Sequence, residues 1–436
     1  MQHHAIFIGC HCDSLINIST IRPWRQIKIV FYVACHKQLL KMKSCSCIIL
    51  LVSLLFTVSS QVLKKAYATV PQLVESAGYP VEKHYAHTSD GYILQVYRIP
   101  HGKGTNQMDG EKKAIVLFHG LIGGCDNFII MGPRKSLAYY LADAGYDVWL
   151  ANLRGNFYTS HRTLTRKDPA FWKYSFDEHG KYDAPAIIDK ILEVTGLSRV
   201  LYIGHSMGFT TLLTMLAQRP EYNDKLIAGV GLAPAAYLNN IQRFVHFVTN
   251  NIKLHKILHE LDVGAIKIPR KYLKALSKYC TSEKNLDHCL NFVYSIVGDD
   301  YGQHDLNMSN VMIMRIQPAS TQQIMHYAKL AETGVLTSWE DGFEGRVKPY
   351  NLSNIRTPVS LWYGENDKLT ATPEILRLAR ELNETGALHS VRPVPQWKKF
   401  NHLDFVYAKD VGKILNTPLV AHVKELFDQF DKRQVK

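Results

Sequence analysis

The chain has 436 residues, of which 46% are hydrophobic and 20% are charged, as is usual for globular proteins. This length suits one large α/β domain with an insertion, or two domains. The formal net charge is +13, but no run of Lys and Arg carries interleaved aromatic residues, so we expect no nucleic-acid partner. Mild basicity of this kind instead favours contact with an anionic lipid surface.

The first 60 residues differ in composition from the rest of the chain. They contain six Lys or Arg and one acid, Asp13. Within them, Met42 and Lys43 precede an apolar stretch of about twelve residues that ends in small residues, as in a secretory signal peptide. This stretch is shorter than the roughly 20 residues that span a bilayer. We therefore expect a signal peptide over residues 42–60 and no transmembrane anchor.

Residues 1–41 precede this second methionine and show no clear periodicity. We expect them to be an upstream leader or a mis-assigned start, absent from the mature protein in either case. A signal anchor that stays uncut is the main alternative to a cleaved signal peptide.

From residue 71 onward, short apolar runs alternate with helical stretches, which indicates a mostly parallel β-sheet in an α/β fold. Residues 81–87 and 92–99 flank the turn Ser89-Asp90-Gly91 and predict a β-hairpin. Helices are expected over residues 182–194, where Pro185 stands early enough to be tolerated, and over residues 373–382. Further strands are expected over residues 114–118, 147–150, 200–203, 228–232 and 359–363.

The alternation is interrupted between residues 237 and 350. Helical periodicity replaces it, with one apolar face made by Ile241, Phe244, Val245 and Val248. Basic residues follow at Lys253, Lys256, Lys267, Arg270, Lys271 and Lys274. We expect a helical cap over residues 237–350, inserted between two parts of an α/β core at residues 71–236 and 351–436. Such a cap is either a lid that meets a lipid interface or a solid helical layer with a solvated basic face.

The segment Gly204-His205-Ser206-Met207-Gly208 carries the strongest functional signal. It follows the apolar run 199–203 and precedes a helical stretch at residues 209–217, the setting in which G-x-S-x-G forms a nucleophile elbow. Glycine is needed on both sides because this turn is strained and crowded. We expect the Ser206 hydroxyl to lie at a helix N-terminus, where backbone N–H groups stabilise an anion.

A serine nucleophile needs a base and a group that orients the base. In α/β-hydrolases the acid and the histidine follow the serine along the chain. Asp367, just after the last predicted strand, is the first candidate for the acid, and Glu365 is the second. His402, on a loop before the closing helical segment, is the first candidate for the base, and His389 is the alternative.

The oxyanion formed by attack on an ester needs two N–H donors. We assign one to Met207, directly after the nucleophile, and the other to Leu121, in the loop after the strand at residues 114–118. Asp404 is interpreted as a residue that holds the loop around His402. No G-x-x-x-x-G-K or H-E-x-x-H motif occurs, so neither a cofactor nor a metal is expected.

Removal of the signal peptide would reduce the cysteines from eight to three. Cys280 and Cys289 are nine positions apart, and in an oxidising compartment they can close a short loop, which leaves Cys125 free. Three sequons that follow the signal are plausible glycosylation sites in a secreted chain: Asn307, Asn351 and Asn383.

An ordered series of segments resembles the acid lipase family of gastric, lingual and lysosomal acid lipases, from about Val81 to Tyr407. The most telling segment is Phe171-Trp172-Lys173-Tyr174-Ser175-Phe176-Asp177-Glu178. The others are Gly78-Tyr79-Pro80, Thr88-Ser89-Asp90-Gly91-Tyr92, His119-Gly120-Leu121, Asn152-Leu153-Arg154-Gly155-Asn156, Lys181-Tyr182-Asp183, Tyr350-Asn351-Leu352-Ser353-Asn354-Ile355 and Asn401-His402-Leu403-Asp404-Phe405. This series is far more specific than G-x-S-x-G, which many hydrolases share.

The resemblance implies an α/β-hydrolase core with a cap, secretion or delivery to lysosomes, and hydrolysis of acylglycerols or sterol esters at a lipid–water interface. It matches the family's catalytic triad to Ser206, Asp367 and His402. It matches the oxyanion donors to Leu121 and Met207, and it implies a disulfide in the cap between Cys280 and Cys289.

Two positions depart from the family pattern. Met207 stands where the family commonly has Gln; the backbone donor survives, but a side-chain contact near the oxyanion is lost, which bears on rate or substrate choice. Gly123-Gly124-Cys125 differs from the usual residues after the oxyanion loop and bears on the shape of the acyl site.

Three other functions stay open at this point. A soluble carboxylesterase would have the same triad without a preference for an interface. A non-catalytic lipid-binding protein would use the same scaffold. A membrane-anchored interaction protein would require the segment after Met42 to stay uncut.

Overall fold

The computed structural model describes residues 65–104, 113–241, 264–282, 284–394 and 397–431. The chain divides into two units, Met1–Gln61 and Val62–Lys436, and all described residues belong to the second. Several predictions lie outside the described residues. They are the leader at residues 1–41, the signal peptide at residues 42–60, the apolar helix face at Phe244, Val245 and Val248, and the basic residues Lys253 and Lys256.

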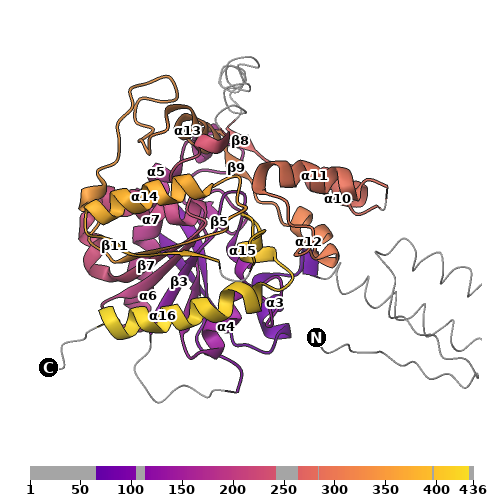
Figure 1. Ribbon diagram of the computed structural model, residues 1–436, viewed down its shortest axis with the longest axis horizontal. Helices are drawn as coiled ribbons and strands as arrows, with labels where there is room; N and C mark the ends of the chain where they lie inside the picture. Colours follow the sequence, from indigo (N-terminus) through magenta and orange to yellow (C-terminus); the bar gives the residue numbers. More distant parts are fainter. Residues whose placement is uncertain (1–64, 105–112, 242–263, 283, 395–396, 432–436) are drawn as a thin grey trace, which may run out of the picture. The chain divides into compact units, whose positions relative to one another are not determined.

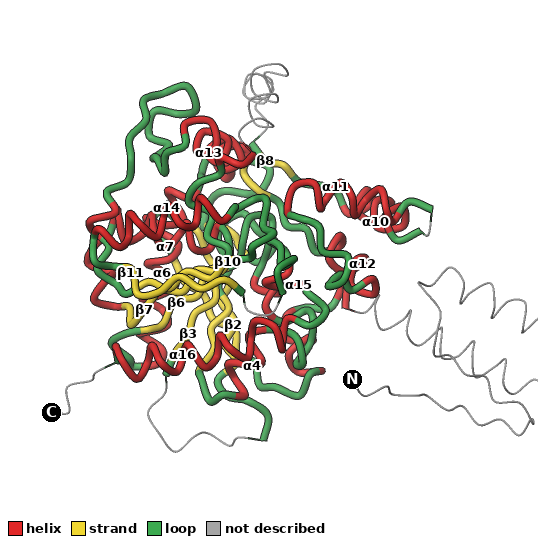
Figure 2. Tube along the Cα trace, viewed as in Figure 1, coloured by secondary structure: helices red, strands yellow, loops and turns green. Residues whose placement is uncertain are grey.

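A nine-stranded sheet lies at the centre of the second unit (Figures 1 and 2). The strand order is β1-β2-β4-β3-β6-β7-β10-β11, and β5 pairs with β2 beside this path. The strands are β1 (Glu82–His87), β2 (Tyr92–Ile99), β3 (Ala114–Phe118), β4 (Asp147–Leu150), β5 (Thr159–His161), β6 (Val200–His205), β7 (Leu226–Leu232), β10 (Val359–Tyr363) and β11 (Leu388–Pro393). From β4 to β11 all neighbours are parallel, whereas β1, β2 and β5 pair antiparallel. The predicted α/β fold with a mostly parallel sheet is confirmed.

Helices cover both faces of this sheet because its central strands are apolar on both sides. In β3, Ile115 and Leu117 belong to one apolar cluster, while Val116 and Phe118 belong to the other, as the alternation of side chains along a strand requires. The first cluster includes α3 (Val70–Ser76), α4 (Leu137–Asp143) and α16 (Thr417–Phe430). The second includes α6 (Ala184–Thr195), α7 (Met207–Gln218) and α14 (Thr372–Glu384). Figure 2 shows α4 and α16 on the opposite side of the sheet from α7 and α14.

In the described part of the chain between β7 and β10, most of the regular secondary structure is helical. It contains α10 (Arg270–Cys280), α11 (Leu286–Val297), α12 (Ser309–Met314) and α13 (Thr321–Thr333). A small antiparallel sheet of β8 (Ala265–Ile266) and β9 (Ala319–Ser320) was not predicted. The Ser320 Oγ lies 2.7 Å from the carbonyl oxygens of both Trp172 and Tyr174, which share its one hydroxyl hydrogen. These bonds anchor the inserted segment on the core.

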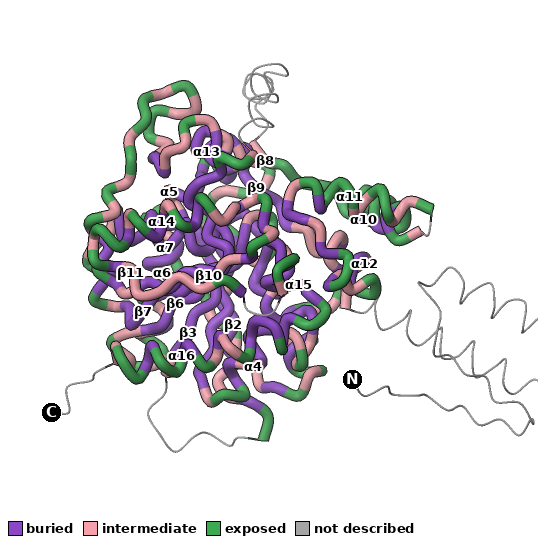
Figure 3. The backbone as a smooth tube through the Cα atoms, viewed as in Figure 1, coloured by how far each residue is buried: buried purple, intermediate pink, exposed green. Residues whose placement is uncertain are grey.

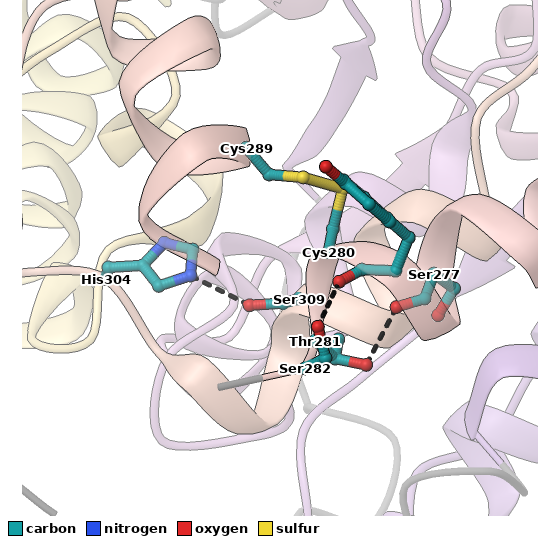
Figure 4. Close-up of a disulfide and its surroundings, with 8 residues drawn as sticks. Ser277, Cys280, Thr281, Ser282, Cys289, His304 and Ser309 are labelled. Carbon is teal, nitrogen blue, oxygen red and sulfur yellow. Dashed lines mark hydrogen bonds between the residues drawn. A yellow bond between two sulfur atoms is a disulfide. The ribbon is translucent and has the colours of Figure 1, made fainter. Parts of the chain in front are cut away.

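Two of the three cysteines in the described residues form a disulfide. A disulfide joins Cys280, the last residue of α10, to Cys289 in α11 (Figure 4). Cys125, the other cysteine in the described residues, is buried and free.

None of the helices within the described ranges is both long and apolar enough to cross a membrane.

The predicted strands at residues 114–118, 147–150 and 359–363 agree with β3, β4 and β10 residue for residue. The predicted hairpin agrees with β1 and β2, while β6 and β7 are each longer than predicted. Strands β5 and β11 were missed. Strand β11 lies at the sheet edge with mostly half-buried side chains, so it lacks the apolar run that marks the buried strands.

The core also contains two short helices, α5 (Phe176–Glu178) and α15 (Asp404–Tyr407).

A buried ion-pair cluster around Arg154 ties three loops together. The Arg154 Nε atom lies 2.8 Å from Asp183 Oδ1, and its Nη1 atom lies 2.7 Å from Asp90 Oδ2. Its backbone N–H also donates to Asp183, and its guanidinium lies 4.1 Å from the ring centre of Tyr92. These contacts connect the turn between β1 and β2, the loop after β4 and the segment before α6.

We expect the substitution Asp183→Asn to lower the free energy of unfolding by about 3–5 kcal/mol, because it removes one partner of a buried charge pair. Denaturant unfolding of the purified protein measures this change. The control Glu193→Gln breaks an exposed pair with Lys190, and its effect should stay below about 1 kcal/mol. Equal effects of the two substitutions would contradict the prediction.

Candidate active site

Ser206 occupies a strained turn between the end of β6 and the start of α7. Its φ and ψ angles are +54° and −117°, a combination that costs an L-residue about 1–3 kcal/mol. The Ser206 N–H donates to the carbonyl oxygen of Leu232 in the neighbouring strand β7, at 2.8 Å. This bond helps to hold the serine in its strained conformation.

Glycine is required on both sides of Ser206 because the backbones approach closely. A Cβ atom at Gly204 would lie 2.4 Å from the carbonyl carbon of Gly208. A Cβ atom at Gly208 would lie 2.2 Å from the carbonyl oxygen of Phe118 in β3. The first turn of α7 therefore packs directly on the end of β3.

A continuous chain of hydrogen bonds connects Ser206 with His402 and Asp367. His402 Nε2 lies 2.9 Å from Ser206 Oγ, and His402 Nδ1 lies 2.8 Å from Asp367 Oδ2. The Asp367 carboxylate also accepts the N–H groups of Leu369 and Thr370 and the Thr370 hydroxyl. Because a carboxylate only accepts, Nδ1 of neutral His402 carries the proton and Nε2 is free to accept from Ser206.

The structure thus brings Asp367 and His402 to Ser206, and not the two alternatives. Glu365 is exposed, two residues nearer to the end of β10. His389 lies on strand β11, where the centre of its ring is 5.9 Å from the ring centre of His422 and 5.2 Å from that of Phe430.

The loop after β3 lies against the elbow. A Cβ atom at Gly120, the residue before Leu121, would lie 3.2 Å from Ser206 Cβ. The N–H groups of Leu121 and Met207 have no acceptor among the described residues. Both N–H groups are therefore available as hydrogen-bond donors.

Two side chains that the sequence interpretation did not single out position this loop. His119 Nε2 accepts the Leu153 N–H at 3.2 Å, so its Nδ1 donates to the Gly120 carbonyl at 2.8 Å. Asn152 Oδ1 accepts the Cys125 N–H at 3.0 Å. His119 and Asn152 both lie in segments that resemble the acid lipase family, and this resemblance was the one sequence feature that pointed to them.

His205 connects the elbow to the loop that carries His402. Its Nε2 lies 3.1 Å from the carbonyl oxygen of His402, and the two rings are 5.1 Å apart. Burial, together with the neighbouring His402, lowers the pKa of His205 to about 3. His205 is therefore neutral, and since a carbonyl only accepts, Nε2 is the protonated nitrogen.

Asp404 holds the same loop, as the sequence interpretation expected. Its Oδ2 accepts the Asn401 N–H at 2.8 Å, and Asn401 Oδ1 accepts the Asp404 N–H at 3.1 Å. Asp404 is also hydrogen-bonded to a second buried carboxyl group, Asp300, which accepts the indole N–H of Trp397. Burial and the neighbouring Asp300 raise the pKa of Asp404 to about 8, and burial raises the pKa of Asp300. Two carboxyl groups in contact share a proton because both cannot ionise together.

The inserted segment also contributes to the site. The Val297 carbonyl at the end of α11 accepts the His402 N–H at 3.3 Å, and the Gly298 carbonyl accepts the Asn401 side-chain amide at 2.9 Å. Gln323, buried near the start of α13, places its Nε2 atom 2.6 Å from Met207 Sδ. Within the described ranges, no group of three or more His, Cys, Asp and Glu residues could hold a metal ion.

Comparison with known proteins defines the class. Residues 70–132 match a family described as a partial alpha/beta-hydrolase lipase region, and residues 113–394 match the alpha/beta hydrolase fold. A solved structure from Sulfolobus solfataricus shares this fold, with a TM-score of 0.53 and 14% identity, and covers 79% of this chain and 99% of that chain. The protein is an α/β-hydrolase.

Proteins related in sequence identify the family within the α/β-hydrolases. Lipase member K of Mus musculus is 33% identical over 375 residues, which cover 83% of this chain and 92% of the mouse protein. Lipase 1 of Drosophila melanogaster is 34% identical over 360 residues, 80% of this chain and 77% of that protein. Gastric triacylglycerol lipase of Bos taurus is 32% identical over 377 residues, 83% of this chain and 92% of the bovine protein. The chain belongs to the acid lipase family and is a carboxylic ester hydrolase.

We expect His205→Leu to lower kcat on a soluble ester by about a hundredfold with little change in KM, because a shift of the base by about 1 Å has an effect of this size. His205→Gln keeps an N–H donor and should recover most of the loss. Equal losses in the two variants, at equal thermal stability, would argue against a positioning role for the His205 N–H.

The pair of Asp300 and Asp404 predicts a pH dependence of stability. The pKa of Asp404 near 8 lies above the value of about 4 in an unfolded chain, so the folded protein holds an extra proton between these values. The resulting stabilisation is complete below about pH 4 and is lost as the pH rises towards 8.

We therefore expect Asp404→Asn, which cannot ionise, to lose less thermal stability than the parent protein between pH 5 and 8, a range below the pKa of about 8. The thermal midpoint is measured at each pH. Asp428→Asn removes an exposed carboxylate on α16 and serves as a control that should follow the parent profile. Parallel profiles for the parent and Asp404→Asn would refute the shared proton.

Proposed function

We propose that the protein is a lipase that hydrolyses carboxyl esters of acylglycerols or sterol esters through a triad of Ser206, His402 and Asp367. The observation that carries this proposal is the hydrogen-bond chain from Asp367 through His402 to Ser206. Membership in the acid lipase family supports the ester class, since relatives at 32–33% identity include gastric triacylglycerol lipases.

In the proposed reaction, His402 Nε2 removes the proton of Ser206 as Oγ attacks the ester carbonyl. Asp367 holds His402 in the required tautomer and stabilises the imidazolium. The N–H groups of Leu121 and Met207 stabilise the tetrahedral oxyanion, and each such donor is worth about 3 kcal/mol. His402 then protonates the leaving alcohol, and water, activated by the same imidazole, hydrolyses the acyl-enzyme.

The proposed architecture has a hydrolase core at residues 71–236 and 351–436 and a helical cap at residues 237–350. The cap assignment is supported by α10, α11, α12 and α13, all of which lie between β7 and β10. The contacts from Val297 to His402 and from Gln323 to Met207 support a cap that borders the substrate site.

We propose that the protein is secreted or delivered to lysosomes through the signal peptide at residues 42–60. The disulfide between Cys280 and Cys289 supports an oxidising compartment. The three sequon asparagines, Asn307, Asn351 and Asn383, are all exposed, as glycosylation requires. N-terminal sequencing of the mature protein tests the cleavage.

We expect Ser206→Ala to lower the hydrolysis of a soluble p-nitrophenyl ester by at least about a thousandfold, and Asp367→Asn by about ten thousandfold, because the Asn variant stabilises the wrong tautomer of His402. Glu365→Gln and His389→Gln, at the two alternative positions, serve as matched controls and should retain the parent rate. Parent-level activity in Ser206→Ala would refute the proposed nucleophile.

A second assay separates a lipase from a soluble carboxylesterase. The rate on emulsified triacylglycerol is compared with the rate on a monomeric short-chain ester. The lipase proposal expects a clear preference for the emulsion, whereas a preference for the monomer would favour the alternative.

A further inference from the structure

Residues 315–318 of the inserted segment, between α12 and β9, contact the loop that follows β3. Figure 3 shows α10 largely exposed, whereas the chain from α12 to β9 is buried or half-buried. Two residues of this stretch, Arg315 and Gln317, bond to the loop. We propose that Arg315 and Gln317 are positioning residues that set the direction of the Leu121 N–H in the oxyanion hole, an inference that rests on the proposed function.

The loop after β3 contains a strained residue directly after Leu121. The Gly123 N–H donates to the Gly120 carbonyl at 3.1 Å, which closes a turn with Leu121 and Ile122 at its two central positions. Ile122 has a φ of +54°, a conformation that is rare for a residue branched at Cβ. Its side chain is 48% exposed, so packing of the side chain restrains this conformation only in part. Strain of this kind persists where other contacts hold it.

Gln317 supplies such a contact. Its backbone N–H donates to the carbonyl oxygen of Ile122 at 2.9 Å. Its buried side chain is held at both amide atoms, since Oε1 accepts the Phe157 N–H at 2.9 Å and Nε2 donates to the Arg315 carbonyl at 3.1 Å. His119 already holds the first end of the turn through the Gly120 carbonyl. Gln317 therefore holds the second end, and the Leu121 N–H lies between the two.

A buried ion pair joins the same two segments. Arg315 Nη1 lies 2.6 Å from Asp126 Oδ2, and the two side chains are 9% and 2% exposed. Asp126 also accepts the Tyr158 hydroxyl at 3.0 Å, and the Arg315 guanidinium also donates to the carbonyl oxygen of Lys65. Charge-assisted bonds of this kind are directional. The pair thus fixes the stretch that carries Gln317 against the end of the loop.

The inserted segment continues from this stretch to the second proposed donor. Further along the chain, the side chain of Gln323 contacts Met207. The segment therefore bonds to the residue after one proposed donor and to the side chain of the other. Since a displacement of about 1 Å changes a rate by about a hundredfold, the two donors act together on an oxyanion only when this segment is seated on the core.

Kinetics on a soluble p-nitrophenyl ester test the proposal. We expect Arg315→Met and Gln317→Met each to lower kcat at least about tenfold, less than the hundredfold to thousandfold that follows the loss of a donor. KM should change less than about twofold, because the donors act on the transition state. Arg315→Lys keeps a cation for Asp126 and should retain most of the rate.

Lys135→Met is the matched control. Lys135 also joins the core to the inserted segment through an ion pair, 2.7 Å from Asp305, and its loss should leave the rate unchanged. If Arg315→Met fails to fold because Asp126 is left unpaired, the double variant Arg315→Met with Asp126→Asn removes both charges and should show the same fall in kcat.

A tetrahedral inhibitor separates positioning from a general loss of structure. The Ser206 oxygen adds to the boron of butylboronic acid and its proton passes to His402, which gives a tetrahedral boronate. We expect the affinity for this inhibitor to fall by about the same factor as kcat/KM, because the boronate needs the same donors. Titration with a phosphonate counts the active sites, so partial unfolding is seen as fewer sites and not as weaker binding.

Three results would overturn the inference. They are parent-like rates in Arg315→Met and Gln317→Met, an equal loss in Lys135→Met, and a fall in kcat with unchanged affinity for the boronate. Each of them appears in the variants, whereas failure of the proposed function appears in the parent protein, as absence of ester hydrolysis or as full activity in Ser206→Ala. The two failures are therefore distinguishable.

Discussion

The close packing of helix α7 on strand β3 is the constraint on which the rest of the site depends. Gly208 lies against the carbonyl of Phe118, and Gly204 lies against Gly208, so that no side chain fits between them. This contact sets the end of β6, the first N–H groups of α7 and the loop after β3 side by side. The packed segments around Ser206 keep it in its strained conformation. One of them is strand β7, in which the carbonyl oxygen of Leu232 accepts the Ser206 N–H.

The candidate site is completed by parts of the chain that are remote from this turn. Asp367 and His402 arrive on loops after β10 and before α15, and the end of α11 binds the His402 backbone through Val297. Near the start of α13, Gln323 meets the side chain of Met207. The inserted segment therefore contacts both the proposed base, His402, and the proposed oxyanion donor, Met207, and a shift of this segment would move both.

Membership in the acid lipase family accounts for the general plan, and two positions differ from the pattern that the resemblance implies. Met207 stands where the resemblance implies Gln, and its Sδ atom lies 2.6 Å from Nε2 of Gln323 in the inserted segment. Cys125, in the departing segment after the oxyanion loop, is buried, and its N–H binds Asn152. Both side chains are buried, so the two departures change the packing inside the protein and not its surface.

The sequence by itself determined the buried strands of the sheet, the elbow at Ser206 and the residue types that the chemistry needs, because apolar runs and glycine spacing act over only a few residues. The short strand β5 and the half-buried edge strand β11 lack such a run and were missed. The sequence could rank Asp367 above Glu365 and His402 above His389, but only the tertiary structure decided which pair meets the serine. The contact between Ser206 and His402 spans 196 positions, and no local pattern encodes the loop positions that create it. The pairing of two buried carboxyl groups beside His402 was likewise invisible in the sequence, because a shared proton depends on burial and contact that exist only in the folded chain.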